Sequence, residues 1–377
     1  MKKIYPVLIM AVAMAACTRS EQPQLPDEPG APKTYKMSIE ATKAPITRAL
    51  QYDEDNYSLS AFWKKGEKVA VVTPDLSSSA GHLIQIGELT AQGDGLSTIL
   101  SGEIDGASVN NLIMFMYPRF PIDYRGQKGT LEDLAQRYDY SYQGGYSSSF
   151  TVSGGEITGS ISDPFMNMQA IIRFHLEDVD GNPIIADQLS IHDSNNQLVL
   201  VGYMGNDDDN TYGDIIISLD DSSYEIWAAL GYFNGNRTFN LTLTATAGEH
   251  YYVCNVGQKT LQSNYFYPVK AVMYGAYKVT VDPNTQNGSI KVSPSDLVVE
   301  GTAVTLTMVP AEHYVFESLY VNGNLVPSED VIYNTYSFTP ESNVTVSATF
   351  KYVEGGANSG RKDYGDVVNG GYWGLGY

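Results

Sequence analysis

Short apolar runs separated by tight-turn residues recur along the chain from residue 57 onward. Clusters of glycine, asparagine and aspartate, such as 180–182 and 234–236, lie between them. Runs of this length and spacing are typical of strands in β-sandwiches. The sequence therefore predicts an all-β protein, with strands that include 57–62, 68–72, 83–86, 112–117, 170–176, 189–192, 198–201, 215–219, 225–230 and 239–244.

One segment departs from this pattern and predicts a short helix. Thr130 is a candidate N-cap, and the acids Glu132 and Asp133 follow it in what would be the first turn. Acidic residues are favourable near a helix N-terminus, where the backbone N–H groups have no intrahelical partner. We therefore expect a helix over residues 130–137 inside an otherwise β-rich domain.

The length and the punctuation of the chain predict its domain organisation. At about 100 to 200 residues per domain, 377 residues suggest two or three domains. Turn residues interrupt the strand pattern at 159–164 and again at 274–276. We therefore expect domains over 34–163, 164–274 and 276–351, followed by a Gly- and Tyr-rich tail over 352–377.

The N-terminal segment is typical of an export signal. Lys2 and Lys3 precede an apolar stretch over 4–16, which is too short to span a bilayer comfortably. Small residues then lead into Cys17, which resembles the lipobox of bacterial lipoproteins. The resemblance implies that residues 1–16 are removed and that Cys17 is acylated; an ordinary signal peptide is the alternative. Residues 17–33 are rich in proline and polar residues and predict a flexible tether.

Charge and composition exclude several classes of function. The net charge of −20 repels phosphate backbones, so we expect no nucleic-acid partner and a covalent rather than an electrostatic membrane attachment. The sequence lacks H-E-x-x-H, G-x-S-x-G and P-loop patterns, and its histidines are scattered singly. We therefore predict no catalytic residue, no metal site and no cofactor, and a protein that is not an enzyme.

Residues 34 to about 273 resemble the fimbrillin family of Bacteroidales lipoproteins. The motifs are MSIEATKAPITR over 37–48, LSAFWKKGEKVAVV over 59–72, DYRGQKGTLEDL over 123–134 followed by YDY over 138–140, and MQAIIRF over 168–174. Their order along the chain carries the resemblance. It implies two tandem fimbrillin-type (transthyretin-like) β-sandwich domains in an outer-membrane lipoprotein, exposed at the cell surface or built into a pilus.

The same resemblance implies a way of assembling. Subunits of type V pili lose an N-terminal strand by cleavage after a basic residue, and the open groove accepts a strand from another subunit. Here the candidate residues are Arg48 and Ala49, the new N-terminus. The alternative is that Arg48 is only a solvated loop residue. Main-chain hydrogen bonds and alternate side chains would hold the incoming strand.

The third domain resembles the divergent InlB B-repeat, a small β-grasp-like module of bacterial surface proteins. Alternating apolar residues over 277–281 and 304–308, with a hairpin signal at Asn322-Gly323, fit this resemblance. In that family the module implies a spacer or adhesion role without catalysis. A single copy is present, so no repeat array is expected.

The favoured function is a non-catalytic fimbrillin-like pilus component or adhesin, in a tip, accessory or monomeric role rather than in the stalk. Its partners would be other pilus subunits or surface ligands. The alternative is a glycan-binding lipoprotein for nutrient uptake. For that role the rings of Trp63, Trp227, Tyr138, Tyr140, Tyr142 and Tyr146 would form a stacking platform, unless the tyrosines pack a loop instead.

Two further segments keep alternatives open. The tail over 352–377 is either a flexible C-terminus or a strand donated to a neighbour, and its glycines argue against the second. The acidic residues over 207–221 form either a solvated loop or a weak calcium site. Asp178 begins a stretch like a calcium loop, but Leu189 occupies the position where such a loop has glutamate, so we expect a hairpin turn there.

Overall fold

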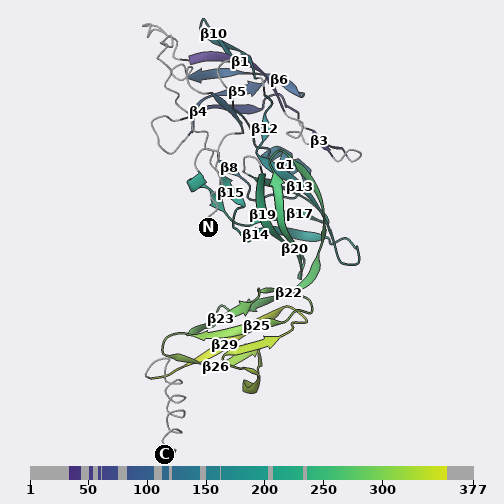
Figure 1. The fold of residues 1–377 in the computed structure, drawn as a ribbon, viewed down its shortest axis with the longest axis vertical. Coiled ribbons are helices and arrows are strands. Elements are labelled where there is room, and N and C mark those ends of the chain that lie inside the picture. Colours follow the sequence, from purple (N-terminus) through teal and green to yellow (C-terminus); the bar gives the residue numbers. More distant parts are fainter. Residues whose placement is uncertain are drawn as a thin grey trace, which may run out of the picture.

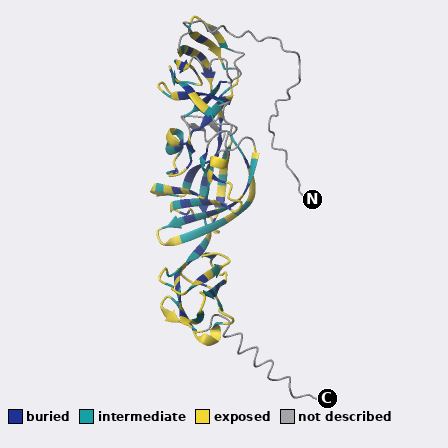
Figure 2. Ribbon diagram, turned by 90° about the vertical axis from the view of Figure 1, so that its left-hand side faces the viewer, coloured by how far each residue is buried: buried dark blue, intermediate teal, exposed yellow. Residues whose placement is uncertain are grey.

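The structure, a computed structural model, describes residues 34–43, 51–53, 58–60, 62–74, 83–105, 113–118, 121–144, 150–161, 163–202, 207–231 and 236–354. These residues form three β-rich parts that follow one another along an elongated molecule (Figure 1). The fold is nearly all β, as the sequence predicts. Figure 2 shows buried residues in the strands of all three parts, where they alternate with exposed ones, and further exposed residues in the loops.

The first part is built on one nine-stranded sheet with the order β10-β11-β1-β6-β5-β4-β7-β9-β12. A backbone bridge between Lys43 and Phe165 brings the end of β1 beside the start of β12, so the sheet closes around a core. Its elements are β1 (Thr34–Thr42), β2 (Gln51–Asp53), β3 (Ser58–Ser60), β4 (Lys68–Pro74), β5 (Leu83–Ala91), β6 (Ser97–Asp105), β7 (Met114–Tyr117), β8 (Ile122–Asp123), α1 (Leu131–Arg137), β9 (Ser141–Gly144), β10 (Phe150–Ser153), β11 (Glu156–Ser160) and β12 (Met166–Asn167).

The second part is a β-sandwich. The sheet β18-β13-β21 packs against β17-β14-β19-β20, and apolar residues of both sheets share one core. That core also takes in Tyr124, Leu134, Tyr138 and Tyr140 from the segment before residue 164. The elements are β13 (Gln169–Glu177), β14 (Ala186–Asp193), β15 (Val199–Gly202), η3 (Asp207–Asp209), β16 (Thr211–Tyr212), β17 (Ile215–Ser223), β18 (Glu225–Gly231), β19 (Asn236–Ala247), β20 (His250–Gln262) and β21 (Phe266–Val272).

The third part encloses its own core between β22-β29-β26-β27 and the sheet β23-β25-β28. Asn322 and Gly323, both with positive φ, form the predicted hairpin turn between β26 and β27. The elements are β22 (Tyr274–Val281), β23 (Gly288–Ser293), β24 (Leu297–Val299), β25 (Val304–Pro310), β26 (Tyr314–Val321), β27 (Asn324–Leu325), η4 (Ser328–Asp330), β28 (Thr335–Phe338) and β29 (Val344–Tyr352).

Strand β22 joins the second and third parts without a linker. Only the buried Met273 separates it from β21, and its first residues pair with Tyr251–Val253 of β20. Further along, β22 pairs with β24 and β29 of the third part. The Asn343 side chain reinforces the junction, since its Nδ2 donates to the Glu249 carbonyl at 3.0 Å. The sheet is therefore continuous across the junction, which favours a rigid connection.

The predicted helix is confirmed as α1. The Thr130 side chain caps it by accepting a hydrogen bond from the Asp133 backbone N–H at 3.1 Å. Leu134 is fully buried and fixes the helix against the core of the second part. A seven-residue helix is too short to be stable alone, so this cap and this packing hold it in place.

Candidate functional site around the first strand

Strand β1 lies in the interior of the first sheet, between two neighbours. It pairs antiparallel with β6 over Thr34–Thr42 and parallel with β11 over Lys36–Glu40. Its side chains alternate, and Met37, Ile39 and Ala41 are at most 1% exposed. Because both edges of β1 carry ladder hydrogen bonds and one face fills the core, the strand is an integral part of the fold.

The inward row of β1 ends in a charged residue. Lys43 is the next inward-facing position after Ala41, and its side chain is completely buried. Its ammonium donates to the Glu67 carboxylate at 3.1 Å and to the Phe62 carbonyl at 3.1 Å. It also lies 4.0 Å from the centre of the Trp63 ring, which is itself fully buried. A buried ammonium is costly unless it is paired, and these contacts supply the pairing.

Aromatic rings complete the surroundings of Lys43. Phe165 packs edge-on against Trp63 with 5.2 Å between ring centres, and the Tyr117 ring centre lies 5.6 Å from the Lys43 ammonium. We call Glu67, Trp63, Tyr117 and Phe165 the lysine cage. The sequence analysis missed this cage. The signal available was that the alternation of Met37, Ile39 and Ala41 continues into a lysine, where an apolar residue is expected.

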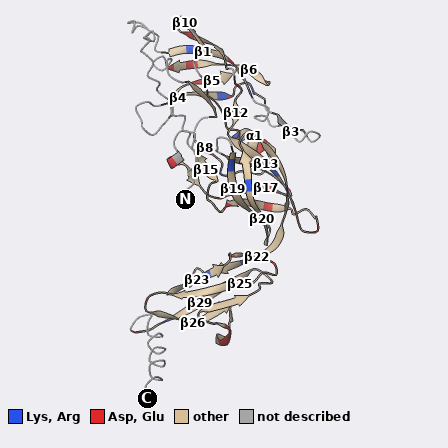
Figure 3. Cartoon of the chain, viewed as in Figure 1, with Lys and Arg blue, Asp and Glu red and all other residues tan. Residues whose placement is uncertain are grey.

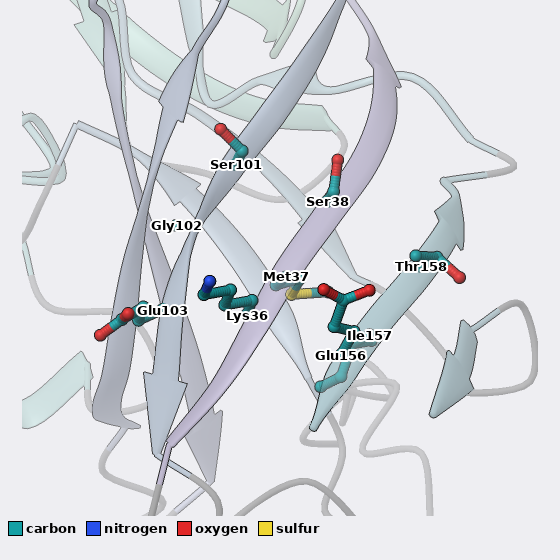
Figure 4. A pocket seen from close by; sticks show the side chains of 9 residues that line it. All are labelled: Lys36, Met37, Ser38, Ser101, Gly102, Glu103, Glu156, Ile157 and Thr158. Carbon is teal, nitrogen blue, oxygen red and sulfur yellow. The ribbon is translucent and has the colours of Figure 1, made fainter. Parts of the chain in front are cut away.

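The outer face of β1 lines a shallow groove of about 370 Å³. Lys36 of β1 pairs across the strands with Glu103 of β6 on one side and with Glu156 of β11 on the other. Figure 4 shows the Lys36 side chain between these two acidic residues. Gly102 allows the close approach of β6 to β5, since a Cβ there would lie 2.1 Å from the Glu88 carbonyl oxygen. On the outer face, the basic side chain of Lys36 is therefore flanked by an acidic residue on each side.

The arrangement defines what the loss of β1 would do. The facing edges of β6 and β11 would lose their hydrogen-bond partners, and the core would open at Met37 and Ile39. Unpaired strand edges beside an apolar slot are a template for another strand. The site can thus hold one extended segment of defined side-chain pattern.

The segment over 123–140, quoted above for its resemblance, fastens the first part to the second. Gln127 is fully buried, and its amide nitrogen donates to the carbonyls of Tyr124 and Ala229, each at 2.9 Å. Its amide oxygen accepts from the Ala229 backbone N–H at 2.8 Å. Gly129, with φ of +73°, allows a close approach, since a Cβ there would lie 2.7 Å from a Leu219 methyl. The motif is thus structural in this chain.

Two tyrosines of the same segment, Tyr138 and Tyr140, hold residues 123–125 in place through hydrogen bonds. Tyr138 donates to the Arg125 carbonyl and accepts from the Arg137 guanidinium, both at 2.7 Å. Tyr140 donates to the Asp123 carbonyl at 3.0 Å. Burial raises the pKa of both phenols, because the phenolate would be poorly solvated there.

These raised pKa values predict a loss of stability at high pH. The unfolded chain loses phenol protons near the ordinary tyrosine pKa of about 10, while the folded chain retains them. The contribution of these two phenols to stability should therefore be constant below a pH of about 10 and be lost as the pH rises above it. Urea titrations from pH 8 upward measure this, and Tyr140→Phe should flatten the alkaline slope. Tyr352→Phe, at an exposed position, should leave the slope unchanged.

The structure corrects the predicted stacking platform. Trp63 is 0% and Trp227 is 6% exposed, while Tyr138 and Tyr140 are buried in the core shared with the second part. Tyr142 is half-buried, and Tyr146 lies outside the described residues. Tyr138 and Tyr140 pack against their own segment, which agrees with the alternative that the tyrosines pack a loop. A platform that uses the rings of Trp63, Trp227, Tyr138 and Tyr140 is excluded, because these four side chains are buried in the cores.

The acidic stretches have structural partners. Asp178 accepts hydrogen bonds from the backbone of Asp180 and of Asn182, which makes the predicted turn between β13 and β14. The Asn182 side chain also donates to Asp178, at 3.0 Å. This hydrogen bond, followed by those from the backbone, lowers the pKa of Asp178. Asp214 contacts His192 at 2.7 Å, and Asp220 pairs with Lys128 at 2.6 Å. Among the described residues, no group of three or more His, Cys, Asp or Glu side chains is arranged to hold a metal ion.

The remaining predicted site residues, Cys17, Arg48 and Ala49, lie outside the described residues. The same holds for the tail beyond residue 354. Among the residues that are described, none belongs to a helix long and apolar enough to cross a membrane. Figure 3 shows acidic residues in all three parts of the molecule rather than in a single patch.

The fold defines the chain as an all-β protein whose first strand is paired on both edges and fills the core of the first part. Residues 277–354 match the family model described as the divergent InlB B-repeat domain. No curated protein matches the chain by sequence.

Several solved structures are similar to this chain at low sequence identity and low TM-score. A candidate cell adhesion protein from Bacteroides ovatus is 12% identical with a TM-score of 0.37, covering 64% of this chain and 96% of that one. A second from Bacteroides uniformis is 10% identical with a TM-score of 0.31, covering 84% and 97%. A fimbrial protein from Bacteroides ovatus is 11% identical with a TM-score of 0.27, covering 68% and 55%. At these values the likenesses carry no argument about what this chain does.

Proposed function

We propose that this chain is a non-catalytic, lipid-anchored surface protein of fimbrillin type that can exchange its first strand. The observation that carries the proposal is the place of β1. It lies between β6 and β11, fills the core with Met37 and Ile39, and precedes the candidate cleavage site at Arg48. Cutting the chain there would detach one strand while the rest of the sheet stays connected.

The N-terminal sequence supports the anchoring. The apolar stretch over 4–16 followed by Cys17 fits a lipoprotein signal, and 17–33 would serve as the tether. Acylation of Cys17 would anchor the protein at the outer membrane. Other pilus subunits or surface ligands would then be its partners, and no cofactor is needed.

The third part supports a role at a tip or as an accessory subunit. Its continuous sheet with β20 and the contact between Asn343 and Glu249 fit a rigid spacer. The tail over 352–377 has glycines at 370, 371, 374 and 376, which suit a donated strand poorly. A subunit that accepts a strand but donates a poor one would end a polymer or stand alone rather than extend a stalk.

The mass and N-terminal sequence of the protein from native cells test the proposal. A mature chain that begins at Ala49, found in high-mass ladders, is the result expected for a subunit that exchanges β1. A chain that begins at acylated Cys17 in every fraction would contradict strand exchange, while leaving the lipid anchor in place. A chain without acylation at Cys17 would contradict the anchor.

A further inference from the structure

The lysine cage places a charged side chain against the apolar core of the first part. The inward row of β1 is apolar at Met37, Ile39 and Ala41, yet it ends in a fully buried ammonium. A buried ion pair is rarely a net gain over a well-packed apolar pair of similar volume. A buried ion pair instead makes binding specific, because a partner without the matching charge cannot form it.

We infer that this groove selects its incoming strand by charge: the donor must carry a basic residue at the inward position that Lys43 occupies. This inference rests on the strand exchange proposed above. The donor pattern is three alternate apolar residues followed, two positions after the last, by lysine or arginine. In β1 these positions are Met37, Ile39, Ala41 and Lys43.

The residues of the lysine cage remain in the protein when β1 is removed. Glu67 and Trp63 belong to the segment just before β4, Tyr117 ends β7 and Phe165 precedes β12. All lie after Arg48 in sequence, so cleavage removes the cation and retains its acceptors. The side chain of Glu67 is 15% exposed, so water would compensate only in part for the lost ion pair. A donor without a cation would have to cover this carboxylate.

The outer face of the groove adds a weaker preference in the same sense. Glu103 and Glu156 face the outward position that Lys36 occupies, seven residues before Lys43. All three side chains are exposed, so solvent screens their attraction. We expect this position to orient a donor with a basic residue near its start, and the buried position to decide acceptance.

The tail of this chain does not carry the required pattern. Its basic residues are Arg361 and Lys362, and the alternate positions before them are Ser359, Ala357 and Gly355, and Gly360, Asn358 and Gly356. Neither row holds three apolar residues ahead of the charge. The occupant we infer is therefore a strand from a different subunit and not the C-terminal tail of a second copy of this chain.

The test uses the folded full chain, cut at a specific protease site inserted between Arg48 and Ala49. Synthetic peptides of residues 34–43 then compete with the cut strand, and native mass spectrometry measures which peptide is retained. The unchanged peptide should be incorporated. The Lys43→Met peptide, of similar volume but without charge, should bind about 30-fold or more weakly, as expected for an acid that loses a buried partner.

A variant of the cut protein and a second substituted peptide make the test specific. On Glu67→Gln protein, the disadvantage of the Lys43→Met peptide should shrink to about threefold or less, because the carboxylate with which the Lys43 ammonium forms its ion pair is no longer present. The Lys36→Met peptide is the matched control, since it makes the same change at an exposed position. This peptide should bind the cut protein without the Glu67 substitution no more than about threefold more weakly than the unchanged peptide does.

The outcomes separate this inference from the proposed function. Equal binding of the unchanged and the Lys43→Met peptides would overturn charge selection and leave strand exchange standing. Incorporation of a tail peptide of residues 361–377 as good as that of the unchanged peptide would also overturn it, in favour of a second copy. Failure of every peptide to replace the cut strand would overturn strand exchange and the inference together.

Discussion

Replacing Gln127 with leucine is expected to destabilise the chain by about 3 to 5 kcal/mol, because three buried backbone groups lose their hydrogen-bond partner at once. These groups are the carbonyl of Tyr124 and both the carbonyl and the N–H of Ala229. Leucine is close to glutamine in volume, so the loss would come from unsatisfied polar groups and not from a cavity. Few side chains in a sandwich satisfy both polar groups of one backbone residue.

Urea unfolding followed by tryptophan fluorescence measures this effect in a Trp373→Phe background. The remaining fluorophores, Trp63 and Trp227, are buried in the first and second parts, so their signals follow the two regions that Gln127 joins. We expect a lower midpoint for both signals. A change in slope would indicate that the two parts no longer unfold together.

Gln136→Leu is the matched control. Gln136 lies on α1, nine residues further along, where it is exposed and its side-chain amide donates to the exposed Glu132 carboxylate at 2.9 Å. Its replacement should change stability by about 0.5 kcal/mol or less. If both variants lost the same stability, the buried hydrogen bonds of Gln127 would not hold the two parts together.

Much of the architecture could be predicted from the sequence, because strands and turns have local signals. Thr130 and the two acids after it predict the helix over 130–137, and Asn322-Gly323 predicts the hairpin between β26 and β27. The pairing of strands could not be predicted in this way. That β1 lies beside β11 in parallel depends on contacts more than a hundred residues apart in sequence.

The candidate site divides along the same line. The alternation of Met37, Ile39 and Ala41 marks an inward face from the sequence alone, but not what that face meets. Lys43 reads as a surface residue until the fold brings it to Glu67 and Trp63. The predicted ring platform failed for the same reason: nothing in the sequence separates an exposed tryptophan from one, like Trp63, that is completely buried.

Ile39→Ala is expected to cost about 3 kcal/mol, within the range of about 2 to 5 kcal/mol for isoleucine to alanine in a core. Ile39 is 1% exposed and lies midway along β1, opposite Leu100 of β6 and Gly159 of β11. The first sheet closes around it, so its neighbours are held on both sides and have little freedom to collapse into the space. Urea unfolding of the uncut chain measures the loss.

The same variant makes the proposed exchange measurable, because the energy that Ile39 contributes to folding is also the energy that retains β1 once the chain is cut. A loss of about 3 kcal/mol corresponds to retention of the cut strand that is weaker by roughly 100-fold. Ser38→Ala, one residue earlier and facing outward, should change neither quantity appreciably. If Ile39→Ala lowered the stability of the uncut chain but left retention of the cut strand unchanged, the core contacts of Ile39 would not be what retains β1 after the cut.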